Sequence, residues 1–520
     1  MIKRPIHPLL LALVPVFSMY AALPGSAALA EFTRAAGAAA AVAAACLAIT
    51  WAIFRDLRKA ALFTSVVLVV FLIVGVTYDS IEDWQVAGFR FARRRFFVPA
   101  VYLGLAAVGV ALYRSARQLG ALTAVANVVM IGALIPPSIS IARAQIVRAR
   151  ERSAMPALDP IVAPAPLRQR PDIYYFVFDR YGGPSTLREH GVDIEPLYRY
   201  LEGRGFYVAR ASRSNYIKTV LSLASSLNMA WLDDVARAYG TDSDNYDPLY
   251  TRLQRHRVGA FLRAHGYQYH HLGPWYWPTR TNQLATHNQN YYDTVPKSVV
   301  QLLDNVLFEP VQHWADSPLV DQRRQHFHRS TRQIEDVLKI APQPGPKFVF
   351  LHLLIPHQPY AFDRDGSYLP IDVENRRDRV ENYANQVRAA NLMIQRLVDG
   401  ILERSAQPPV IIVQGDEGPY PPGTEVDGYQ WRQASAHVLQ ERAGILNAYL
   451  LPGASGARLY PEISPVNSFR VVFNTYFGTD LPLLPDRTFR HASDRRPYAF
   501  DDITEVVRQD PRALNLAHAR

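Results

Sequence analysis

The segment that decides the fold is Phe176-Val-Phe-Asp-Arg-Tyr-Gly-Gly183, in which an apolar run gives way to an aspartate and two glycines. A short continuous apolar run of this kind predicts a buried strand, here over residues 172–178. Further strand patterns, separated by helical ones, follow at 267–272, 347–354, 410–414 and 445–451. Apolar strands that alternate with helices predict an α/β domain with a largely parallel sheet covered on both faces.

Ionisable side chains stand where three of these strands end. Asp179 follows the first strand, His352 and His357 lie at the end of the 347–354 run, and Asp416 and Glu417 follow the 410–414 run. In open α/β sheets, ligands bind outside the carboxyl ends of the strands. A single aspartate before glycine usually marks only a turn or a helix cap. Three strand ends with ionisable side chains on one edge of the sheet predict a ligand-binding site.

Thr219 begins a further pattern, an apolar helix predicted over residues 219–232. A hydroxyl at this place lies near the free amides and the positive dipole end of the helix, which favour an oxyanion and an ionised nucleophile. The alternative is that Thr219 only caps the helix.

In the order and spacing of these motifs, residues 171 to 480 resemble the sulfatase and alkaline phosphatase superfamily, most closely its lipoteichoic acid synthase-like branch. The resemblance implies that Asp179 is an acidic metal ligand and that Thr219 is both nucleophile and ligand. It implies that Asp416-Glu417-Gly418 matches the family's Asp-His-Gly metal motif. It also implies that His357, and less surely His352, assist catalysis at the transferred group.

Glu417 departs from this resemblance, because relatives usually carry histidine there. Asp179, Thr219, Asp416 and Glu417 would form an all-oxygen set for one divalent ion, which favours Mn²⁺ or Mg²⁺, allows Ca²⁺ and disfavours Zn²⁺. The Cys/Ser-x-Pro-x-Arg motif of true sulfatases is absent around Thr219, which argues against classical sulfate-ester hydrolysis.

Several carboxylates beside an anionic substrate would need cationic help. The candidates for substrate binding are Lys218, Arg180 and Arg280, with His357 in support and Trp277 as a platform for a sugar. The alternative for the basic residues is a solvated surface, and for Trp277 it is a core-facing loop.

Five uncharged apolar stretches precede this domain, each close to the roughly 20 residues that a spanning helix needs. They are Leu9–Ala30, Ala35–Phe54, Ala60–Tyr78, Phe96–Tyr113 and Leu119–Ala142. The first stretch also has the features of a signal peptide, with small residues before Glu31. We therefore expect a membrane domain over residues 1–150, a proline-rich linker over 151–170 and an extracytoplasmic catalytic domain over 171–520.

These patterns predict a membrane-anchored, metal-dependent transferase or hydrolase of phospho- or sulfo-esters. It would act through a covalent threonine intermediate on membrane lipids or lipid-linked glycans of the cell envelope. The alternative is a catalytically silent binding or assembly factor in which Glu417 marks decay of the metal site. The sequence has no basic-aromatic patch for nucleic acid, and it leaves the oligomeric state open.

The topology gives a first prediction. Five crossings from a cytoplasmic N-terminus place residues 171–520 outside the cytoplasm, and so do the four crossings that remain if cleavage leaves residue 31 outside. A protein that fluoresces only in the cytoplasm, fused after Arg520, should stay dark. A truncated fusion after Lys59, which the same layout places inside, should be bright. Bright fluorescence from the Arg520 fusion would contradict the layout.

Overall fold

The computed structural model describes residues 4–22, 29–81, 93–115, 119–154, 156, 158–164, 170–290, 322–426, 428–454 and 458–509. The chain divides into two compact units. The second unit comprises Glu151–Tyr292 and Arg323–Arg520. The sequence pattern also suggests a helix near residues 298–308, which lies outside the described residues.

Four N-terminal helices are long and apolar enough to cross a membrane, so the chain is a membrane protein. They are α2 (Leu29–Phe54), α3 (Leu57–Ile81), α4 (Arg94–Arg114) and α5 (Gly120–Ala154). The first predicted span is represented by α1 (His7–Ala22), a helix of 16 residues that falls short of a full crossing. The Asn127 side chain of α5 ties down the start of α1, because its amide oxygen accepts the His7 amide at 2.8 Å.

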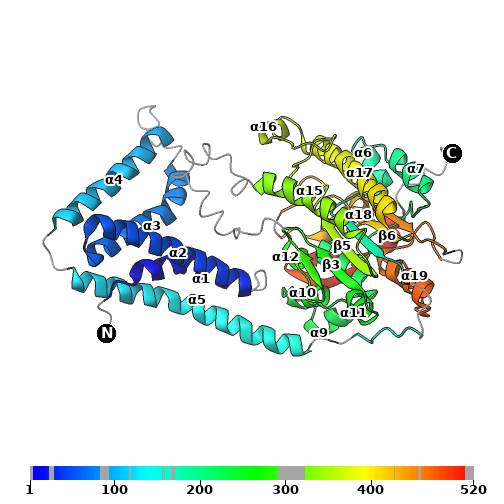
Figure 1. Cartoon of the computed structure of the whole chain (residues 1–520), viewed down its shortest axis with the longest axis horizontal. Helices are drawn as coiled ribbons and strands as arrows, with labels where there is room; N and C mark the ends of the chain where they lie inside the picture. The colour runs from blue at the N-terminus through cyan, green and yellow to red at the C-terminus, as the bar shows by residue number, and fades with distance from the viewer. Residues whose placement is uncertain are drawn as a thin grey trace. The chain divides into compact units, whose positions relative to one another are not determined.

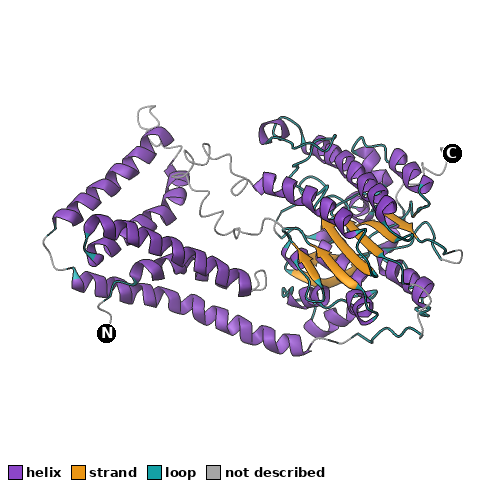
Figure 2. Cartoon of the chain, viewed as in Figure 1, coloured by secondary structure: helices purple, strands orange, loops and turns teal. Residues whose placement is uncertain are grey.

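The second unit is built on a seven-stranded sheet with the order β2-β7-β6-β1-β5-β3-β4 (Figure 2). Parallel pairing joins β1 to both β5 and β6, and β3 to both β5 and β4, whereas β7 runs antiparallel to β6 and β2. The prediction of a largely parallel α/β sheet is therefore confirmed. The strands are β1 (Ile173–Phe178), β2 (Tyr207–Val208), β3 (Gln268–Leu272), β4 (His287–Gln289), β5 (Lys347–Leu353), β6 (Val410–Gly415) and β7 (Asn447–Leu450).

Both faces of the sheet are packed under helices, as Figure 1 shows. Alternate residues of β1 enter two different apolar clusters, with Phe176 on one side and Tyr175 on the other. All six residues of β1 are buried, which explains its unbroken apolar run. The first cluster packs under α7 (Glu195–Gly203), α15 (Gln322–Ile340) and α17 (Arg379–Arg404), and the second under α8 (Thr219–Asn228), α11 (Arg257–Ala264) and α19 (Pro465–Phe477).

The helical pattern over residues 247–264 forms two helices rather than one. Residues Asp247–Gln254 form α10, and α11 starts anew because the His256 side chain accepts the Gly259 amide and caps it. A second, two-stranded sheet of β8 (Phe489–Ser493) and β9 (Arg496–Asp502) was not predicted. The remaining elements are α6 (Pro184–Glu189), α9 (Asp233–Tyr239), α12 (Trp277–Arg280), α16 (Ile371–Glu374), η1 (Trp431–Gln433), α18 (Ala436–Ala443) and α20 (Thr504–Arg508).

Candidate metal centre and nucleophile

The register of the three central strands brings their carboxyl ends together. Phe178, the last residue of β1, pairs with Leu353 of β5 and with Gly415 of β6. Asp179 and Asp416 follow two of these residues directly, and His352 precedes the third. One ligand atom from each of Asp179, His352 and Asp416 lies within 4.8 Å of the other two. The parallel pairing therefore creates a cluster that can hold a divalent ion.

The chemistry of this cluster fits a cation. Asp179 Oδ1, Asp416 Oδ2 and His352 Nε2 are buried and have no hydrogen-bond partner among the described residues. Burial is the main cause that raises the pKa of Asp179 to about 7 and the pKa of Asp416 well above its usual range. Repulsion between these carboxylates and Glu417 adds to both shifts. A bound cation would relieve that repulsion and satisfy the unpaired atoms.

His352 is oriented like a metal ligand. Its Nδ1 lies 2.7 Å from the Thr279 hydroxyl, and its Nε2 lies 3.4 Å from Asp179 Oδ2. Burial lowers the pKa of His352 to about 4, so the ring is neutral at pH 7. A neutral histidine fixed through one ring nitrogen presents the other to a metal. The set of candidate metal ligands therefore includes a nitrogen. The argument against zinc assumed that all ligands are oxygens, so it does not apply to this set.

Arg180 holds the loop after β1 in an unusual conformation. Its φ of 64° lies in the left-handed region, which a non-glycine residue adopts at some energetic cost. This turn points the Arg180 amide at Asp416 Oδ1, 3.0 Å away, and the Tyr383 hydroxyl donates to the Arg180 carbonyl oxygen at 2.8 Å. The backbone thereby binds one oxygen of Asp416 and leaves the other without a partner.

Glu417 lies apart from this cluster and is paired with a buried arginine. Arg442 of α18 places Nη2 2.5 Å from Glu417 Oε2, and both side chains are almost inaccessible to solvent. The Arg442 guanidinium also donates to the Ile217 carbonyl oxygen at 2.6 Å and stacks on the Tyr420 ring, 3.6 Å from its centroid. A protein cation thus neutralises the carboxylate that stands where relatives carry histidine.

The residue after Glu417 has to be glycine. A Cβ at Gly418 would lie 2.0 Å from the Glu441 carbonyl oxygen, closer than any real contact. The Gly418 amide donates to the Arg442 carbonyl oxygen at 2.8 Å, so this close approach joins the Asp-Glu-Gly turn to the end of α18.

Thr219 is the first helical residue of α8, and Lys218 occupies the cap position without a side-chain cap bond. The Thr219 hydroxyl instead donates to Glu417 Oε1 at the long distance of 3.5 Å. Ser222, one turn later, donates to the Asp416 carbonyl oxygen at 2.7 Å and fixes the start of the helix against the end of β6. The geometry therefore does not support the interpretation of Thr219 as a cap.

His357 lies beside the cluster. Its backbone amide donates to the Asp179 carbonyl oxygen at 3.2 Å, and its ring lies 6.0 Å from that of Trp275. Burial, followed by the charge of Arg180, lowers the pKa of His357 well below its usual value. Nδ1 contacts the Gln358 carbonyl oxygen, which can only accept, so the proton resides on Nδ1 and Nε2 is free to accept.

The four residues predicted to bind the substrate lie at different places around the cluster. Arg180 borders the cluster, with its Nε 4.0 Å from Asp179 Oδ1. Lys218 is 2.5 Å from Asp494, in the turn between β8 and β9. Trp277 is partly buried and packs edge-on against Tyr250, 4.8 Å between ring centroids. Arg280 is the last residue of α12.

Arg442 is the functional residue that sequence reasoning missed. It lies in Gln440-Glu441-Arg442-Ala443, a stretch typical of an exposed helix, yet its side chain is fully buried. The only available signal was indirect, because the unusual Glu417 required a counter-charge from somewhere in the chain.

The chain is similar to known proteins in part of its sequence and to several solved structures. Residues 236–443 match the family model described as Sulfatase. A search of curated proteins gave no match. Among solved structures, the chain is similar to the C-terminal periplasmic domain of EcEptC from Escherichia coli, with 12% identity, 66% of this chain and 96% of that chain covered, and a TM-score of 0.41.

Two further solved structures are similar. Lipooligosaccharide phosphoethanolamine transferase A (EptA) from Neisseria meningitidis shares 14% identity over 80% of this chain and 75% of that chain, with a TM-score of 0.39. The putative sulfatase yidJ from Bacteroides fragilis shares 12% identity over 63% of this chain and 82% of that chain, with a TM-score of 0.37. Residues 236–443 are thus similar in sequence to the Sulfatase family model, in agreement with the resemblance that the motifs of the sequence indicate.

Proposed function

We propose that the protein is a membrane-anchored, metal-dependent enzyme that transfers or hydrolyses phospho- or sulfo-ester groups of cell-envelope lipids or glycans. The observation that supports this most is the convergence of Asp179, His352 and Asp416, whose unpaired buried atoms fit a divalent cation. Mn²⁺ and Mg²⁺ remain our favoured ions because two of the three ligands are carboxylates, while His352 makes Zn²⁺ compatible as well.

The nucleophile in this proposal is Thr219. A divalent ion at the cluster would stabilise an ionised Thr219 oxygen and the oxygens of the substrate's ester. Glu417 is within reach of the hydroxyl proton, at 3.5 Å. Attack by the Thr219 oxygen forms a bond to phosphorus or sulfur, and the bond to the leaving oxygen breaks. The threonine proton passes to Glu417, and the leaving oxygen takes a proton from solvent.

The second half of the reaction reverses the first. A hydroxyl of an acceptor attacks the threonine ester, the bond to Thr219 breaks, and the proton held by Glu417 returns to the threonine oxygen. His357 Nε2, an acceptor in the neutral ring, would take the proton of the incoming hydroxyl and release it to solvent, which balances the proton that the first leaving oxygen took. A glycan or lipid acceptor makes the protein a transferase and water makes it a hydrolase. The membrane helices favour lipid or lipid-linked substrates and thus transfer.

One observation favours the alternative of a catalytically silent protein. Arg442 supplies a permanent positive charge to Glu417, next to the threonine. If that charge replaces a metal altogether, the purified protein should stay free of divalent ions even in millimolar Mn²⁺ and Mg²⁺. Metal occupancy, measured on the full chain, separates the two functions.

Substitution of Thr219 tests the nucleophile. Thr219→Ala should abolish turnover of labelled membrane lipids while the protein stays folded and still binds Mn²⁺, because Asp179, His352 and Asp416 are intact. Mass spectrometry should detect a covalent ester on the peptide that contains Thr219. Ser225→Ala is a matched control, since its hydroxyl donates to the Ala230 carbonyl oxygen just beyond the other end of α8. Full turnover by folded Thr219→Ala protein would eliminate the covalent mechanism.

The buried carboxylates predict how stability depends on pH. Without metal, burial raises the pKa of Asp179 to about 7 in the folded state from its ordinary value of 3.8, so protonation favours the folded state. This contribution is complete below about pH 4 and is lost as pH rises through about 7, at most about 4 kcal/mol. The thermal midpoint of metal-free protein should therefore be lower at pH 8 than at pH 5.5.

Mn²⁺ should raise the midpoint at pH 8 much more than at pH 5.5, since it competes with that proton. Asp179→Asn should flatten the metal-free pH dependence and remove the effect of Mn²⁺. Asp363→Asn, which changes a half-exposed aspartate paired with Arg377, is the control and should leave both intact. An Asp179→Asn protein that still responds to Mn²⁺ would show that the ion binds elsewhere.

A further inference from the structure

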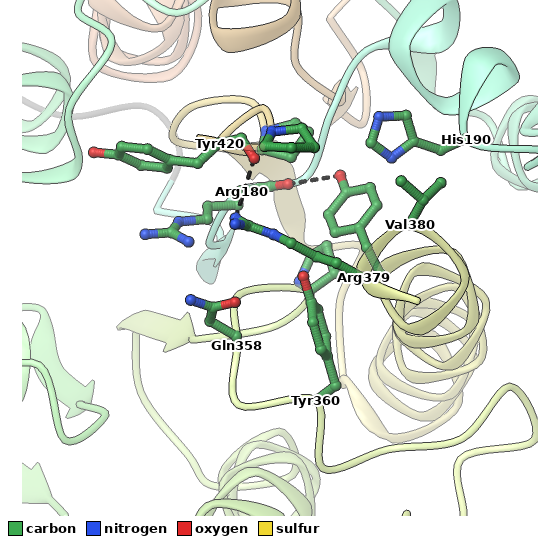
Figure 3. A pocket seen from close by; sticks show the side chains of 11 residues that line it. Arg180, His190, Gln358, Tyr360, Arg379, Val380 and Tyr420 are labelled. Atoms are coloured by element: carbon green, nitrogen blue, oxygen red, sulfur yellow. Dashed lines mark hydrogen bonds between the residues drawn. The ribbon is translucent and has the colours of Figure 1, made fainter. Parts of the chain in front are cut away.

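A pocket next to the candidate metal centre has a strongly basic lining. Arg180, Gln358 and Arg379 line it, together with Tyr360, Tyr383 and Tyr420 (Figure 3). Arg180 borders the metal cluster on one side, as its amide binds Asp416, and the pocket on the other. Arg180 therefore contacts both the pocket and the proposed reaction site.

A carboxylate from a loop fills this basic cradle. Glu425 Oε1 accepts from Arg180 Nη1 at 2.6 Å, and Oε2 accepts from Arg379 Nη2 at 2.8 Å and from Gln358 Nε2 at 2.7 Å. Two guanidinium groups and an amide that converge on one anion form the pattern that proteins use for phosphate and carboxylate groups.

The donors of the cradle are held in place independently of Glu425. Arg180 follows β1, its carbonyl oxygen accepts from Tyr383, and its guanidinium lies over the Tyr420 ring, 4.2 Å from the centroid. Arg379 is the first residue of α17, and its Nη2 also donates to the Tyr420 carbonyl oxygen at 3.1 Å, as Figure 3 shows.

Glu425, in contrast, belongs to a loop at the surface. Its side chain is 25% exposed, and Val426 next to it is 56% exposed. An incoming anion that accepts the same hydrogen bonds from the two guanidinium groups and the amide can take the place of this loop carboxylate.

We propose that Arg180, Gln358 and Arg379 form a subsite for a phosphate group of the substrate, and that Glu425 occupies this subsite in the resting protein. The inference rests on the proposed function, because it assigns a second anionic group to the substrate of that reaction. The subsite selects substrates that carry a phosphate beside the ester that reacts. Glu425 acts as an internal competitor that excludes substrates too weakly charged to displace it.

The test measures binding of inorganic phosphate to the full chain by calorimetry, with Thr219→Ala in every variant and with divalent ions removed. Neither turnover nor the metal can then contribute. Glu425→Gln should bind phosphate about tenfold more tightly than the parent, as expected when the competitor fills the cradle about nine-tenths of the time. Adding Arg379→Gln to Glu425→Gln should abolish the gain.

Arg377→Gln and Asp363→Asn are the matched controls, because this neighbouring ion pair at 3.0 Å lies outside the pocket. Both should leave phosphate binding unchanged. Equal phosphate affinity in the parent and in folded Glu425→Gln protein would overturn the proposal, as would a gain that survives Arg379→Gln. If no ester forms on Thr219 in the unsubstituted protein but Glu425→Gln still tightens phosphate binding, only the proposed reaction is refuted. If the ester forms but Glu425→Gln leaves phosphate binding unchanged, only the subsite is refuted.

A second arm identifies the source of the phosphate. The Glu425→Gln protein is placed in discs of phosphatidylcholine with or without phosphatidylglycerol, and inorganic phosphate is titrated again. Weaker phosphate binding in the phosphatidylglycerol discs supports a lipid headgroup as the natural occupant. Equal binding in both supports a soluble phosphate ester in the same subsite.

Discussion

The parallel pairing of β1 with β5 and β6 is the constraint on which the rest of the site depends. It aligns Phe178 with Leu353 and Gly415, so that the chain leaves all three strands at the same edge. Because β1 is buried on both faces, a shift of one residue would move Phe176 and Tyr175 into the wrong clusters. The same packing that fixes the register therefore fixes the distances among Asp179, His352 and Asp416.

Burial at that edge of the sheet removes the water that would stabilise the negative charge of the carboxylates. Three carboxylates, Asp179, Asp416 and Glu417, lie out of contact with water, and two of them have no protein cation bound to them by hydrogen bonds. Arg442 neutralises the third from within the protein. This division explains how a glutamate can stand at the usual histidine position: it is compensated by an arginine, and in the function we propose Asp179, His352 and Asp416 hold the ion.

The sequence predicted those parts that follow from local pattern. Continuous apolar runs located β1, β3, β5 and β6, and their polar ends located Asp179, His352 and Asp416. Features that depend on distant packing were not predictable. The break between α10 and α11 depends on a cap by His256. Arg442, which pairs with Glu417, and Arg379, which pairs with Glu425, lie in helices whose sequences have the ordinary pattern of a surface helix. An arginine buried by tertiary contacts looks the same in sequence as one in solvent.

The most direct test of this account is a crystal structure of the full chain grown with Mn²⁺, with the ion located by its anomalous scattering. The account predicts one strong peak between Asp179, Asp416 and His352, with oxygen ligands at about 2.0–2.6 Å and the Thr219 hydroxyl facing the ion. A peak bound by Glu417 after displacement of Arg442 would change the ligand set but keep the centre. No peak near the carboxyl ends of β1 and β6, at saturating Mn²⁺, would contradict the account.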